Sequence, residues 1–436
     1  MSVIKFFIQF LIIVCLFFGT LKAEEFDHPL TLSEIVDIAL SHHPLTKQVW
    51  WKAQRAASVV GDAKSAYYPY VGVEAFVEHG RDFQFINGPN TNYTITGADL
   101  VLSLLLYDSE ERTNKVKASK MALIAAQWHV DWAIQKVMVD ALVAAYATLH
   151  AQEVFQATFA SFEDAKKLSM TTEELYRVGL KPISDVYTTK AMFAQMKMEL
   201  SEKLGLLEIQ KGKLAASLGL SANTCLQLAM LNPVQYPQGN HIAALICLAN
   251  KKRADLLAKR SQLYESYYNL NKVSASFGPK VFLSGRGGLN HAFHDQASGG
   301  QYQVALNLEM PLFNGFETIY KNRIAYADTK LTQEELAQVQ LDIALEVLTY
   351  SKSLESAEKM LPDASSNLEN SQNAYEIVVE KYSLGEEKIA EVSNAQMQLA
   401  AARIKYSDTK TKWLLSIANL AYATGTLTHY SGAQCN

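Results

Sequence analysis

The chain has 436 residues, a net charge of −4 at pH 7 and a sequence pI of 6.2. The chain is weakly acidic and has no basic stripe of the kind that proteins use to bind nucleic acid, so nucleic acid is not expected as a partner. Length alone would predict two or three globular domains, but an internal repeat overrides that expectation and predicts one structural unit built twice.

The first segment in chain order, residues 1–23, has the pattern of a signal peptide. Lys5 precedes a largely apolar run over residues 6–18, and a cleavage site follows Ala23. The alternative is an uncleaved anchor, although the run is short for a membrane span. After residue 23 no apolar run approaches ~20 residues, so we expect no transmembrane helix in the mature chain. If it enters a membrane, it must do so as strands closed into a barrel.

The first half of the mature chain is predicted to order its elements as helix, two strands, long helix and helix. The first helix is expected over about 31–66, and the strands over about 69–79 and 95–107. The long helix covers 109–178, a stretch with neither Gly nor Pro, and the last helix covers about 182–218.

The second half repeats this order. Strands are predicted over about 279–290 and 301–312, and a second long helix runs from about 316 to 384. Pro362 lies inside that helix and should kink or break it, because proline removes one backbone hydrogen bond.

Apolar residues follow two neighbouring tracks on the first long helix, each with alternating spacings of four and three. One such track is a coiled-coil seam, and two adjacent tracks suit a helix that contacts partners on both flanks. A broad-faced bundle helix is the alternative. The tracks are Val130, Ile134, Val137, Ala141 and Ala144, and beside them Met138, Leu142, Ala145 and Leu149.

The predicted strands alternate apolar and polar residues in runs of about ten, which is typical of outer-membrane strands. An ordinary sheet over a core is the alternative. Long polar loops at 80–92 and 290–300 and the length of the flanking helices favour the membrane reading. Four strands cannot close a barrel, whose smallest examples need about eight, so several chains must contribute to one barrel.

Two segments of the chain resemble each other, residues 176–186 and 382–392. Tyr, Gly, Ile and Val recur in them at a constant offset of 206 residues. A duplication of this kind predicts that each half builds a similar unit. The predicted divisions are a first repeat at 24–228, a linker at 229–240, a second repeat at 241–428 and a tail at 429–436.

Together with these hairpin segments, two further patterns make the chain resemble a TolC-family outer-membrane factor. They are Ala66-Tyr-Tyr-Pro69-Tyr-Val-Gly-Val73 before the first strand and Met310-Pro-Leu-Phe-Asn-Gly315 before the second long helix. The resemblance covers nearly the whole mature chain. It implies a mainly α fold with a membrane portion: a homotrimer with a twelve-stranded β-barrel in the outer membrane, continued by a twelve-helix α-barrel across the periplasm.

The resemblance also implies partners and a function. The chain would be the gated exit channel of a tripartite efflux or type I secretion system in a Gram-negative bacterium. It would act with a periplasmic adaptor (membrane fusion protein) and an inner-membrane pump of RND, ABC or MFS type. Small molecules and proteins both remain open as cargo. The alternative from a different class is a non-channel trimeric coiled-coil scaffold at the surface or in the periplasm.

In the family the hairpin tips receive the adaptor. The positions that match those tips are Val178, Gly179, Leu180, Leu384, Gly385 and Glu386. Gly179 and Gly385 are also well placed to supply the left-handed turn between two helices, a structural role compatible with docking.

Asp185 and Tyr382 match the family's gate pair, with Ser184 beside the acid, and a hydrogen bond between them would hold the tip closed. Alternatively, Asp185 is a first-turn acid that the helix dipole favours.

Glu391 and Asn394 map onto the aperture of the tunnel, where three copies of the carboxylate would attract cations. The alternative for Glu391 is a solvated acid on a helix face. Glu387 stands where the family often has an arginine for a second gate link, which leaves the strength of the gate open.

Nothing in the sequence indicates catalysis, a metal or a cofactor, because no nucleophile elbow, phosphate loop or zinc motif is found. His291 and His294 are predicted in a surface loop without a third ligand. Cys225 and Cys247 could pair in an oxidising compartment, but with Cys435 the mature chain has an odd count, which argues against a full disulfide framework.

Overall fold

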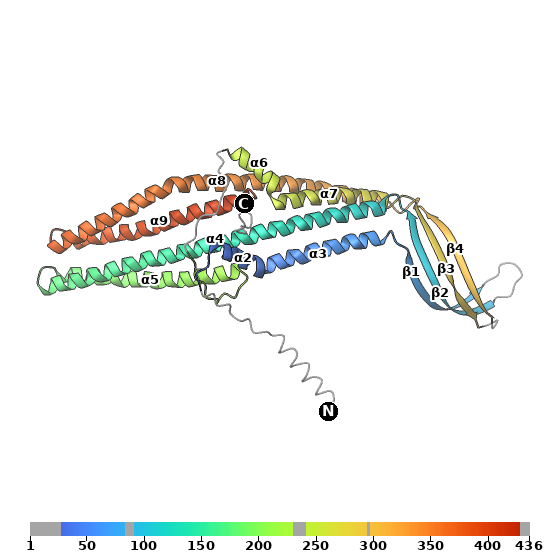
Figure 1. Ribbon diagram of the computed structural model, residues 1–436, viewed down its shortest axis with the longest axis horizontal. Coiled ribbons are helices and arrows are strands. Elements are labelled where there is room, and N and C mark those ends of the chain that lie inside the picture. Colours follow the sequence, from blue (N-terminus) through green and yellow to red (C-terminus); the bar gives the residue numbers. More distant parts are fainter. Residues whose placement is uncertain (1–27, 83–90, 230–240, 294–296, 428–436) are drawn as a thin grey trace, which may run out of the picture. The chain divides into compact units, whose positions relative to one another are not determined.

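The computed structural model describes residues 28–82, 91–229, 241–293 and 297–427 (Figure 1). The predicted signal peptide, almost all of the predicted linker and the C-terminal tail with Cys435 lie outside the described residues. The chain divides into two compact units, one of residues 1–46, 134–245 and 347–436, the other of residues 47–133 and 246–346. The units cut across the two repeats, because each long helix passes from one unit to the other.

The order of elements repeats between the two halves. The first half contains α2 (Leu32–His42), α3 (Pro44–Ser65), β1 (Tyr70–Asp82), β2 (Thr91–Tyr107), α4 (Glu111–Arg177) and α5 (Ile183–Ser217). The second half contains α6 (Ile242–Lys252), α7 (Ala254–Ala275), β3 (Lys280–Ala292), β4 (Ala297–Glu309), α8 (Glu317–Leu384) and α9 (Ile389–Ala423). α5 and α9 have the same length of 35 residues.

The helix predicted over 31–66 is wrong as one element, because the chain breaks at His43. The backbone of His43 is extended (ψ 129°), as expected of a residue before proline, whose ring disfavours the helical conformation there. A capping box between Thr31 and Glu34 starts α2. The second half breaks in the same way at Arg253 without a proline.

The helix does not break at Pro362, since α8 continues through it to Leu384; the kink that the sequence also allowed stays a prediction. Proline removes the donor to the carbonyl of Glu358. Glu358 and Pro362 both lie on the exposed side of the helix, where water can satisfy that carbonyl, so the rest of the helical ladder persists.

The strands form one antiparallel sheet in the order β1-β2-β3-β4. One face carries apolar side chains that are largely exposed in the single chain, including Val73, Leu100, Tyr302, Leu306 and Leu308. An exposed apolar band of this kind is typical of strands that face lipid.

The loops between paired strands are shorter than the sequence predicted. Residues 80–82 pair with 91–93, so β1 and β2 extend into the expected loop. Tyr93 donates a hydrogen bond to Glu78 across this ladder at 3.0 Å. His291 also lies in a strand rather than a loop, with its Nδ1 2.8 Å from the Ser298 hydroxyl. His294 lies outside the described residues.

A polar row crosses the other face of the sheet. Glu74 lies directly opposite Asp99, which lies directly opposite Gly288. The Asp99 side chain is fully buried, and the Arg286 guanidinium reaches both acids, at 2.9 Å from Glu74 and 3.6 Å from Asp99. A Cβ on Gly288 would come within 2.2 Å of the Asp99 carboxylate, so the glycine makes room for this buried acid.

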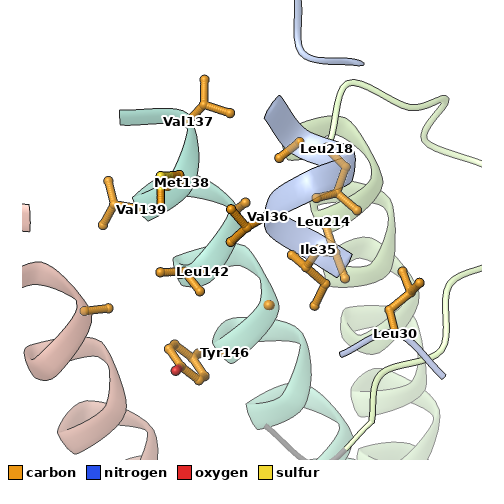
Figure 2. Close-up of a cluster of buried hydrophobic side chains, with 14 of the residues drawn as sticks. Leu30, Ile35, Val36, Val137, Met138, Val139, Leu142, Tyr146, Leu214 and Leu218 are labelled. Atoms are coloured by element: carbon orange, nitrogen blue, oxygen red, sulfur yellow. The ribbon is translucent and has the colours of Figure 1, made fainter. Parts of the chain in front are cut away.

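The main apolar core of the first unit joins α2, α4, α5 and α9. Figure 2 shows Ile35 and Val36 from α2 beside Leu142 of α4 and Leu214 of α5. The middle of both predicted tracks on the long helix is buried in this cluster, namely Val137, Met138, Ala141, Leu142 and Ala145.

Among the described residues, α4 is the one helix whose length and apolar composition would allow it to cross a membrane, and half of its most apolar stretch is buried. A core helix passes the same test, so the finding carries little weight. The expectation of no transmembrane helix in the mature chain stays a prediction.

Candidate functional site

The turn between α4 and α5 is a Schellman motif. The Gly179 N–H donates to the Tyr176 carbonyl at 2.9 Å, and the Leu180 N–H donates to the Leu175 carbonyl at 2.9 Å. Gly179 adopts a φ of 82°, in the left-handed region that only glycine enters at little cost. Pro182 then caps α5.

The turn between α8 and α9 repeats this geometry. The Gly385 N–H donates to the Tyr382 carbonyl at 3.1 Å, and the Glu386 N–H donates to the Lys381 carbonyl at 2.9 Å. Gly385 has a φ of 88°. The left-handed turn predicted at both glycines is therefore confirmed. No atom outside the turn would contact a Cβ on either glycine, so the requirement for glycine is conformational and not steric.

The predicted docking residues are exposed. Val178, Leu180 and Leu384 are between 67% and 69% accessible, and Gly179, Gly385 and Glu386 are exposed as well. Apolar side chains at such exposure add no stability to the single chain, which fits a surface available to another protein.

The two hairpins are joined near their tips by Asp185 and Tyr382. The Tyr382 hydroxyl donates a hydrogen bond to Asp185 Oδ2 at 3.1 Å. Tyr382 is almost fully buried, whereas Asp185 is half-buried. The Ser184 hydroxyl lies 3.4 Å from the other carboxylate oxygen, as a long donor. Asp185 also lies in the first turn of α5, so the interaction with the helix dipole and the bond to tyrosine occur together.

Burial raises the pKa of Tyr382 to about 12, and the adjacent Asp185 charge contributes to this rise. The hydroxyl is consequently a proton donor throughout the neutral range. The Lys181 ammonium lies 3.9 Å from the centroid of the Tyr382 ring, a distance at which a cation is attracted to the face of the ring. The tyrosine is thus held by the other hairpin through both its hydroxyl and its ring.

Apolar packing supports this link. Tyr382 belongs to a buried cluster with Leu168 of α4 and with Val392 and Leu399 of α9. Side chains of α5 and α8 pack against the same cluster. This packing fixes the position of the Tyr382 hydroxyl beside Asp185.

A second polar connection lies further along the hairpins, and sequence reasoning missed it. Arg403 of α9 donates to Asp164 at 3.0 Å and to the Ser161 hydroxyl at 3.1 Å, both on α4, and to Gln372 of α8 at 3.0 Å. Three partners on two helices fix the guanidinium in one position. The partners are more than 200 residues apart on α4 and α9, so their pairing was not readable from one sequence.

A third connection links the same helices. Glu153 of α4 accepts from Lys410 at 2.6 Å and from the Ser407 hydroxyl at 2.8 Å, both on α9. The hairpin α4–α5 is therefore tied to α8–α9 at three successive levels.

The structure does not pair the other predicted site residues. Glu391 and Asn394 are both exposed on α9. Within the described ranges Glu391 forms no ion pair or side-chain hydrogen bond. Glu387 is half-buried at the tip.

In the part of the chain that the structure describes, no group of three or more His, Cys, Asp or Glu side chains is placed to hold a metal ion. Cys225 and Cys247 are exposed and free.

The chain matches the outer membrane efflux protein family over residues 35–220 and 245–426. It is 23% identical to the protein CyaE of Bordetella pertussis over 72% of this chain and 66% of that protein. It is 21% identical to the outer membrane protein TolC of Salmonella enteritidis over 94% of this chain and 84% of that protein. The outer-membrane channel OprN has the same fold, with a TM-score of 0.82 at 18% identity over 94% of this chain and 92% of that one.

The chain belongs to the outer membrane efflux protein family, of which TolC is a member. It is a transport protein and not an enzyme. Its place is the outer membrane of a Gram-negative bacterium, from which it extends into the periplasm, and its role is that of an exit channel. Channels of this family work with adaptor proteins and inner-membrane pumps.

Proposed function

We propose that the chain is one third of a homotrimeric, gated duct in a tripartite efflux or type I secretion system. The observation that carries the gate is the hydrogen bond from Tyr382 to Asp185, because it joins two hairpins that must separate if a passage opens between them. The family description favours small-molecule efflux over protein secretion as the main cargo.

Two features of the single chain support assembly into a trimer. Its four-stranded sheet exposes both edge strands and an apolar face, and twelve strands from three chains would close such a sheet into a barrel. Several large apolar helix residues are exposed as well, including Trp50, Trp51, Leu341 and Leu345. Neighbouring chains that pack as a ring of helices would bury them.

The gate works through the three levels of contact between the hairpins. Opening must break the Tyr382–Asp185 bond at the tip, and it must also loosen Arg403 and Glu153 further along. Glu391 and Asn394 line the aperture in this proposal. Three Glu391 carboxylates around one axis attract cations and oppose anions.

The exposed tips at Val178–Leu180 and Leu384–Glu386 receive the periplasmic adaptor. Each tip combines exposed apolar side chains with a glycine in the left-handed conformation. The adaptor supplies the energy that separates the hairpins, and an inner-membrane pump of RND, ABC or MFS type delivers the cargo.

Cell fractionation and export assays test this proposal. The chain should occur in the outer membrane as a trimer that dissociates only on heating, and a soluble periplasmic monomer would refute the duct. Deletion of the gene should raise drug sensitivity if the cargo is small molecules, or remove proteins from the medium if it is protein. If the protein forms a trimer but deletion of its gene changes neither drug sensitivity nor the secreted proteins, the coiled-coil scaffold would be supported.

A further inference from the structure

The pair that joins the hairpins within one chain exists twice in the sequence. Tyr176 and Tyr382 occupy the same position in their Schellman turns, three residues before the glycine. Asp185 and Glu391 are each the third residue of the helix that follows. Both pairs of equivalent residues are separated by the same 206 residues as the starts of α4 and α8.

Only one of the two possible tyrosine–acid bonds forms inside the chain. Tyr382 is almost fully buried against Asp185, whereas Tyr176 is 42% accessible. Glu391 is exposed and has no side-chain partner among the described residues. Tyr176 on the first hairpin and Glu391 on the second therefore do not form the equivalent bond within the chain.

A ring of three chains gives these residues a place to meet. In such a ring the two kinds of hairpin alternate, so every hairpin contacts one from its own chain and one from a neighbour. The duplication makes the two interfaces alike, and the contact Asp185–Tyr382 maps onto Glu391 of one chain and Tyr176 of the next. We propose that Tyr176 donates a hydrogen bond to Glu391 of the partner subunit; this rests on the trimer of the proposed function.

The polar connections described above at Arg403 and at Glu153 are not duplicated. If the two halves merely packed alike, the residues of these two connections would also recur at the spacing of 206. At the same spacing, the pair Arg403 and Asp164 corresponds to Lys197 and Asn370, and the pair Lys410 and Glu153 corresponds to Leu204 and Lys359. The tyrosine–acid pair is therefore the one of these three contacts whose donor and acceptor are present in both copies.

The bond between chains is the weaker of the two. Within the chain, Lys181 lies over the ring of Tyr382 at 3.9 Å. The residue equivalent to Lys181 in the second hairpin is Glu387, which brings a second negative charge where the first interface has a positive one. The contact between chains therefore separates before the contact within the chain.

Chemical cross-linking between chains tests the pairing. In a background with the mature cysteines 225, 247 and 435 changed to serine, Tyr176→Cys and Glu391→Cys are introduced together. A short bis-maleimide suits the purpose, because the two Cβ atoms of a tyrosine–glutamate pair are too far apart for a disulfide. The matched control carries Asp185→Cys with Tyr382→Cys, which should cross-link within the chain and leave the monomer mass unchanged.

The expected result is a covalent trimer on a denaturing gel for the first pair, and a covalent dimer when the two single variants are co-expressed on separate chains. Intact heat-dissociable trimers without these products would overturn the pairing, while a protein that forms no trimer before cross-linking would overturn the proposed function itself. Tyr176→Phe provides an independent measurement in planar bilayers. It should raise channel conductance, but less than Tyr382→Phe does, and an unchanged conductance would contradict the inference.

Discussion

Removal of the Tyr382 hydroxyl by Tyr382→Phe should open the tip of the channel. The bond it deletes is 3.1 Å long and ends on a carboxylate, and hydrogen bonds to charged groups contribute about 1.5–3 kcal/mol. Since Asp185 is half-exposed, we take the lower value. Three copies in a trimer that opens as one unit would then contribute about 4.5 kcal/mol, which shifts the balance between closed and open forms by about three orders of magnitude.

Single-channel conductance in a planar bilayer measures this shift. Tyr382→Phe and Asp185→Ala should each raise the conductance, and the double variant should add little, because both changes delete the same bond. Tyr187→Phe is the matched control, since Tyr187 lies on α5 near the same tip and is 69% accessible. An unchanged conductance in both single variants, or an equal rise in the control, would refute the reasoning.

Three further outcomes follow from the contacts described. Arg286→Gln leaves the buried Asp99 carboxylate without a cation. It should lower the thermal stability of the protein, by at most about 3 kcal/mol because the arginine is half-exposed. Adding Asp99→Asn should restore part of that stability, and no recovery would contradict a charge effect. The pKa of Tyr382 is raised from 10 to about 12. The hydrogen bond should therefore hold the tip closed below pH 10 and be lost as the pH rises from 10 to 12. Channel conductance should rise over this pH range in the unmodified protein and should not do so in Tyr382→Phe. Pro362→Ala should stabilise the protein by up to about 3 kcal/mol, which would be measured as a higher thermal unfolding temperature. A lower unfolding temperature would mean that α8 needs the proline for packing.

The hairpin tips were predictable from the sequence because their geometry is local. A glycine after a long helical pattern, followed shortly by a second helix, specifies the left-handed turn at Gly179 and Gly385 without knowledge of any distant residue. The contact between Asp185 and Tyr382 came from the resemblance to a known family. Nothing in the spacing of these residues alone required it, and their role as a gate stays a proposal.

The predictions that were wrong mostly concern where elements end, and one of those ends has a clear local cause. The break at His43 follows from Pro44, a signal that was present but outweighed by the helical pattern around it. The break at Arg253 has no such proline; its guanidinium is held by Asp255, two residues further on, and by Glu346 of α8, and the second of these contacts could not be read from the sequence. His291 likewise joins a strand because its backbone pairs with Ser298.

The Schellman turns at Gly179 and Gly385 have a consequence for how the two copies have diverged. Each turn is specified by one glycine and two backbone hydrogen bonds, so its conformation depends little on the side chains around it. After the duplication they were free to change: one tip now has Lys181 and Pro182, the other Glu387 and Lys388 at the same places. The backbone of the tip is inherited unchanged, while its charge can evolve toward whichever partner it meets.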